Sequence, residues 1–76
     1  MPVFLRSAYI VYAHSVLQRQ SGLGYLSAWA KQTFPSTKAK NDFFETLGRK
    51  LMPATEDRLH GLTPPATPDQ ILAKLD

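Results

Sequence analysis

The sequence predicts a small all-α protein with a three-helix domain, a proline-rich segment and a short C-terminal helix. Apolar residues recur at helical spacing through most of residues 3–51, and glycine or proline stands where one helix would end and the next begin. No alternating apolar and polar stretch longer than residues 8–13 favours a strand. A chain of 76 residues forms one small domain, which buries only about 60% of the surface exposed on unfolding.

The first predicted helix covers residues 3–19, which contain neither proline nor glycine. Two apolar stripes run along it: Leu5, Tyr9, Tyr12 and Val16, and Val3, Ile10 and Leu17. A helix that is apolar around most of its girth needs burial on two sides, either inside the domain or against another chain. A short strand over residues 8–13 is the alternative, because β-favouring residues gather there, but the length of the stretch favours a helix.

The second and third predicted helices cover residues 23–33 and 37–51. Gly22 and Gly24 separate the second helix from the first, and Pro35 ends it. Ser36 or Thr37 begins the third helix, because a side-chain oxygen at this position accepts a hydrogen bond from a free backbone N–H group. The third helix has an apolar and a charged face, formed by Phe43, Phe44, Leu47 and Leu51 and by Lys38, Asp42, Glu45 and Arg49. The charged residues make two i,i+4 pairs of opposite sign.

Residues 53–76 are predicted to be a proline-rich segment that follows a helical domain at residues 1–52. The segment contains Pro53, Pro64, Pro65 and Pro68, with a turn or short helix at residues 56–60. Thr67, Pro68 and Gln70 form a capping box with proline at the first helical position, so a final helix starts here. A helix of about two turns is not stable alone in water. Its apolar residues therefore dock on the domain or on a partner, and they are the candidate partner-binding residues: Ile71, Leu72 and Leu75.

Positive charge is concentrated in the first half of the chain. Residues 1–41 carry five bases and no acid, whereas residues 42–76 carry four bases and six acids, so the two parts have net charges of +5 and −2. A half of one sign attracts phosphate, an anionic lipid surface or an acidic partner. The alternative is that these charges only keep a small domain soluble.

The second and third helices, joined by residues 34–36, match a helix-turn-helix, in which the N-terminal part of the second helix enters the major groove of DNA. Lysine and asparagine at that position suit phosphate and base-edge contacts. The candidate nucleic-acid-binding residues are Lys31, Lys38, Lys40, Asn41 and Arg49. Asp42 and Glu45 count against DNA, because they would lie close to phosphates.

The leading prediction is therefore a small non-enzymatic DNA-binding or regulatory protein of helix-turn-helix type, with duplex DNA or an acidic protein surface as its partner. The alternative is a protein-interaction module, either an accessory subunit of a larger complex or a small inhibitor of the kind that phages encode. The two-sided apolar first helix and the short last helix favour this alternative, which includes a homodimer.

No catalytic, cofactor or metal site is predicted. The absence of cysteine excludes disulfides and thiolate zinc sites. His14 and His60 have no neighbours at ligand spacing, and Gly22 and Gly24 lack the rest of a dinucleotide-binding loop. The aromatic residues recur at helical spacing, so we expect them in the core rather than on a base-stacking surface: Tyr25, Trp29, Phe34, Phe43 and Phe44.

The chain shows no membrane or secretion signal. The longest uncharged run, residues 7–18, is shorter than the ~20 apolar residues that a membrane-spanning helix needs. Tyr9, Tyr12 and His14 interrupt it, so it matches a secretory signal poorly. We expect a cytoplasmic protein, with an organellar protein as the alternative.

Overall fold

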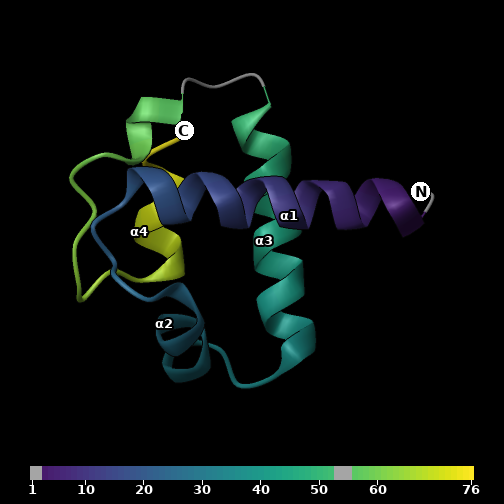
Figure 1. The fold of residues 1–76 in the computed structure, drawn as a ribbon, viewed down its shortest axis with the longest axis horizontal. Coiled ribbons are helices and arrows are strands. Elements are labelled where there is room, and N and C mark those ends of the chain that lie inside the picture. Colours follow the sequence, from purple (N-terminus) through teal and green to yellow (C-terminus); the bar gives the residue numbers. More distant parts are fainter. Residues whose placement is uncertain (1–2, 53–55) are drawn as a thin grey trace.

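The computed structural model describes residues 3–52 and 56–76, and these residues form helices and no strand (Figure 1). In chain order, the elements are α1 (Val3–Gln20), α2 (Leu26–Thr33), α3 (Thr37–Leu51), the 3₁₀ helix η1 (Glu56–Leu59) and α4 (Pro68–Ala73). The predicted all-α class is confirmed.

The centre of the fold is the crossing of α1 over α3, which Figure 1 shows with the two helices at a steep angle. The two helix backbones are in close contact at Gly48, where an added Cβ atom would lie 2.3 Å from the carbonyl oxygen of Tyr9. Only glycine allows two helix backbones to approach this closely, because any side chain would overlap the opposite backbone. Side chains from both helices enter one buried cluster, among them Ala13, Val16, Leu17, Phe44, Leu47 and Leu51.

Among the described side chains of α1, the fully buried ones lie in the second half of the helix. Ala13, Val16 and Leu17 are fully buried, whereas Leu5 is 40% exposed and Val11 is 67% exposed. In Figure 1 the first half of the helix extends past α3, away from the rest of the chain. The predicted burial on two sides is therefore confined to the second half of the helix.

Helix α2 begins at Leu26, later than the predicted 23–33. Gly24 has a φ of +79°, and this left-handed conformation cannot continue into a right-handed helix. Leu23, before the turn, is nevertheless buried in the core. The indole Nε1 of Trp29 donates a buried hydrogen bond of 3.1 Å to the carbonyl oxygen of Ala66, which ties α2 to the segment before α4.

The C-terminal segment belongs to the same core as the helices before it. Its apolar residues are members of the buried cluster that also contains α1 and α3: Leu59, Leu62, Ala66, Ile71 and Leu75. The predicted turn or short helix at 56–60 is the 3₁₀ helix η1. Pro53 and the predicted boundary between residues 52 and 53 fall at residues 53–55, which lie outside the described residues. One buried cluster thus contains residues from both predicted parts of the chain.

Helix α4 begins with the predicted capping box. The hydroxyl of Thr67 accepts a hydrogen bond from the backbone N–H of Gln70, and the side chain of Gln70 accepts one from the backbone N–H of Thr67. Both interactions satisfy N–H groups that the first turn leaves free.

Candidate nucleic-acid interface

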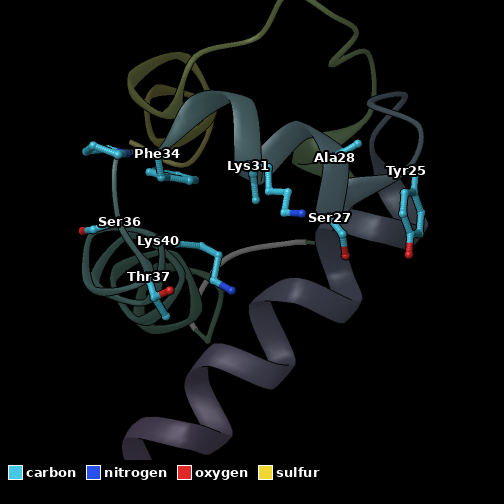
Figure 2. Close-up of a pocket in the computed structure, with 10 residues that line it drawn as sticks. Tyr25, Ser27, Ala28, Lys31, Phe34, Ser36, Thr37 and Lys40 are labelled. Atoms are coloured by element: carbon cyan, nitrogen blue, oxygen red, sulfur yellow. The ribbon is translucent and has the colours of Figure 1, made fainter.

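A concavity of about 610 Å³ lies between α2 and the start of α3. We call it the basic groove, and it is lined by Tyr25, Ser27, Ala28, Ala30, Lys31, Phe34, Pro35, Ser36, Thr37 and Lys40. Figure 2 shows Lys31 from α2 and Lys40 from α3 extending into the space between the two helices. Two positive charges that are distant in sequence therefore share one opening.

The position of Lys40 follows from the way α3 begins. Ser36 is in an extended conformation, and its hydroxyl accepts a hydrogen bond of 3.1 Å from the N–H of Ala39. This confirms the predicted cap and assigns it to Ser36 rather than to Thr37. Because Ser36 is the cap, Thr37 is the first helical residue, and its side chain lines the groove together with Lys40.

A second, smaller concavity of about 330 Å³ adjoins the basic groove on the α1 side. Its lining is mainly apolar, with Ile10, Val11 and Phe44, and the polar residues His14 and Asn41 also take part. Lys40 and Ala30 line both concavities. The amide of Asn41 therefore lies close to the groove, beside Lys40.

The lysines of the groove have no acidic partner among the side chains that the structure describes. Neither Lys31 nor Lys40 forms a salt bridge with an Asp or Glu in the part of the chain whose side chains are described. Like charges at one opening raise the local positive potential, and an anion entering between them relieves their repulsion.

Lys38 and Arg49 lie in a different environment, an ion-pair network between α1 and α3. Arg6 of α1 donates hydrogen bonds of 2.6 Å to both Asp42 and Glu45. Lys38 lies 2.8 Å from Asp42, and Arg49 lies 3.1 Å from Glu45. The guanidinium of Arg49 also lies 4.7 Å from the ring centroid of Tyr9, at a distance typical of cation–π contacts. The structure thus separates the predicted set, with Lys31, Lys40 and Asn41 at the concavities and Lys38 and Arg49 beside acids.

The network shifts the titration of its members. A hydrogen bond from Lys38 and the charge of Arg6 lower the pKa of Asp42. Hydrogen bonds from Arg6 and from Arg49 lower the pKa of Glu45, and the hydrogen bond to Glu45, together with the charges of Glu45 and Asp42, raises the pKa of Arg6. All of these shifts favour the charged forms.

Acid is expected to destabilise the fold through these two carboxylates. A pKa that is lower in the folded state gives stability that is complete above the unfolded values of 3.8 and 4.5 and is lost as the pH falls through the folded values. We expect the melting temperature, followed by circular dichroism, to fall below about pH 4.5. The variant Arg6→Gln should show a smaller fall, whereas Lys74→Gln, which removes an exposed charge at the end of α4, should behave as wild type. An unchanged acid dependence in Arg6→Gln would contradict this assignment.

The candidate partner-binding residues of α4 pack inside the chain. Ile71 is fully buried, Leu75 is buried, and Leu72 is half-buried against the same core. The domain itself therefore provides the burial that the short helix requires.

Of the five aromatic residues predicted to lie in the core, four pack together and one is exposed. Trp29, Phe34, Phe43 and Phe44 form a packed cluster with ring centroids 5.2–6.4 Å apart, as expected. Tyr25 is 76% exposed and lies at the rim of the groove, so its predicted place in the core is wrong. It precedes α2, and helical spacing relative to Trp29 therefore does not apply to it. The sequence signal that could have excluded Tyr25 from the helix is the glycine at position 24, because glycine permits the positive φ observed there.

Other kinds of site are not found in the described residues. No group of three or more His, Cys, Asp or Glu side chains among them could hold a metal ion. Within the same residues, no helix has the length and apolarity needed to cross a membrane. Comparison of the chain with protein-family models, with curated proteins and with solved structures finds no match.

Proposed function

We propose that this chain is a small DNA-binding protein of helix-turn-helix type, in which α2, residues 34–36 and α3 form the binding unit. The observation that supports this proposal most is the convergence of Lys31 and Lys40 on one groove without an acidic partner in the described part of the chain. The phosphate backbone carries one negative charge for about every 1.7 Å of duplex axis, so a pair of free lysines is a favourable contact for it.

The neighbouring groups suit a phosphate. Hydroxyls of Ser27 and Thr37 line the groove, and a hydroxyl can donate a hydrogen bond to a phosphate oxygen. Asn41, the next residue after Lys40, carries an amide of the kind that reads adenine by two hydrogen bonds.

The acids of α3 do not prevent this function. Asp42 and Glu45 are paired with Arg6, Lys38 and Arg49, whereas Lys40 and Asn41 line the concavities. Because the negative charges have positive partners, they repel a phosphate in the groove only weakly.

The salt dependence of binding tests the proposal. Each phosphate contact contributes about −0.9 to the slope of log affinity against log salt for B-DNA, so Lys31→Ala with Lys40→Ala should flatten the slope by about 2. Fluorescence anisotropy with a labelled duplex at several salt concentrations measures this slope. Lys74→Ala removes the same charge from α4 and should leave the slope unchanged. Lys38→Ala should have a smaller effect than Lys40→Ala, since Lys38 is paired with Asp42. Absence of binding at low salt, to either double- or single-stranded DNA, would refute the proposal.

A second candidate is a protein-interaction module that binds through the first half of α1. The exposure of two large apolar residues of α1, Leu5 and Val11, favours it. Binding through this surface would depend on Leu5 and would be insensitive to substitution of Lys31, which lines the basic groove and not the concavity that contains Val11, so these two substitutions distinguish the candidates.

A further inference from the structure

We infer that the basic groove binds a single strand of nucleic acid, with a phosphate between Lys31 and Lys40 and a neighbouring base stacked on Tyr25. This inference rests on the proposed binding of nucleic-acid phosphates by Lys31 and Lys40, and not on insertion of α3 into a duplex, and it specifies the form of nucleic acid that fits the groove best. It follows from one juxtaposition, an exposed aromatic residue at the same concavity as two lysines that have no acidic partner in the described part of the chain.

Tyr25 differs from the other aromatic residues whose side chains are described. The residue is 76% exposed, whereas Trp29 is 9% exposed and Phe44 is 1% exposed. A ring that contributes so little to the core is available to a ligand. Successive bases stack on rings of this kind in proteins that bind single strands, because every base presents a π face.

The backbone around Tyr25 is held in place. The carbonyl oxygen of Tyr25 accepts a hydrogen bond of 3.2 Å from the N–H of Trp29, which closes the first turn of α2. The carbonyl oxygen of Gly24 accepts a hydrogen bond of 3.2 Å from the side chain of Gln18. The stacking surface is therefore attached to two helices, and little backbone order has to be gained on binding.

The order of side chains along the groove matches a nucleotide chain. Figure 2 shows Tyr25 at one end, Ser27 beside it, and Lys31 and Lys40 further along. A strand lying along this line offers a base to the ring and a phosphate to the lysines. In a duplex the faces of the bases are covered by their neighbours, so stacking on Tyr25 requires an unpaired base.

Alternative anions would use only part of this surface. A free phosphate or an acidic peptide would neutralise Lys31 and Lys40 but would leave the face of Tyr25 uncovered. The contribution of Tyr25 to binding therefore separates a nucleic-acid strand from the other anions.

Three labelled oligonucleotides of equal length test the inference: a mixed-sequence single strand, the corresponding duplex, and an abasic strand that keeps the phosphates and lacks the bases. We expect wild-type protein to bind the mixed single strand most tightly. Tyr25→Ala should weaken that binding by about 5- to 150-fold, the range measured when stacking aromatic residues are replaced by alanine. The same substitution should leave binding of the duplex and of the abasic strand unchanged. DNA and RNA versions of the mixed strand are compared in parallel, and tighter binding of either one identifies the preferred sugar.

Two variants control for structural effects. Tyr25→Trp keeps an aromatic face and should retain tight binding of the mixed strand. The melting temperature of Tyr25→Ala should equal that of wild type, because the ring is largely exposed.

The outcomes distinguish this inference from the proposed function. If binding depends on Lys31 and Lys40 but Tyr25→Ala affects no oligonucleotide, or affects all three equally, the single-strand inference is wrong and DNA binding stands. If an acidic peptide of equal charge competes as well as the mixed strand, the inference is also wrong. If no oligonucleotide binds at low salt, the proposed function itself fails.

Discussion

Deletion of residues 67–76 is expected to leave the chain unfolded or only marginally folded at 25 °C. The deletion removes Ile71, which is fully buried, together with Leu75 and the half-buried Leu72. Full burial of such a side chain contributes about 1.5–3 kcal/mol, and the core of a domain this small supplies only about 3–5 kcal/mol in total. Loss of residues 67–76 therefore removes a stabilisation comparable to the total free energy of unfolding that such a core supplies.

Circular dichroism at 222 nm and a thermal melt of the truncated protein measure this effect. Asp76→Asn is the control, because it removes only the exposed pair between Lys50 and Asp76, and exposed pairs of this kind contribute little. A truncated chain that melts at the wild-type temperature would show that α4 is not part of the core.

Gly48→Ala is expected to lower stability, although glycine to alanine in the interior of a helix usually raises it by about 0.5–1 kcal/mol. The added Cβ would lie 2.3 Å from the carbonyl oxygen of Tyr9 and 2.8 Å from its carbonyl carbon. Backbone atoms cannot rotate away as side chains can, so α1 and α3 would have to separate.

Overpacking of this kind costs about 1–3 kcal/mol, and each kcal/mol lowers the melting temperature of a domain of this size by roughly 4–8 °C. Thermal denaturation of Gly48→Ala, compared with Thr46→Ala on the exposed side of the same helix, measures the effect. A higher melting temperature for Gly48→Ala than for wild type would show that the two helices are not in close contact.

Local sequence signals predicted the helices well. The predicted 37–51 agrees with α3, and 3–19 differs from α1 by one residue, because proline, glycine and capping residues act within a few positions of themselves. The predicted start of the second helix at residue 23 is wrong for a reason that is also local. Gly24 adopts a positive φ, so Leu23 and Tyr25 on either side of it lie outside α2. The close crossing at Gly48 could not be predicted, because it joins Tyr9 to a glycine that looks ordinary in its own helix.

The structure divides the predicted nucleic-acid-binding residues between the concavities and an ion-pair network, because long-range contacts are not visible in local sequence. The sequence predicts one nucleic-acid-binding set of Lys31, Lys38, Lys40, Asn41 and Arg49, and the structure places Lys31, Lys40 and Asn41 of that set at adjoining concavities. Lys38 and Arg49 belong to the network around Arg6, a residue 36 positions before Asp42 in the chain. No local pattern shows that Arg6 lies beside these acids, so their pairing follows from the tertiary fold alone.

The hydrogen bond between Trp29 and Ala66 would couple the proposed binding of nucleic acid to folding. Helix α2 has 8 residues, fewer than the ~12–15 that an isolated helix needs, so it forms one wall of the groove only while the C-terminal segment holds Trp29. A ligand of the groove therefore binds the folded chain and not the unfolded one. At 100 times its dissociation constant such a ligand adds about 2.7 kcal/mol to the free energy of unfolding, which approaches the about 3–5 kcal/mol that a core of this size supplies. For a chain without disulfides, the proposed nucleic-acid ligand would then stabilise the fold, and the occupied protein would be about 1.5 to 1.9 times as stable as the free one.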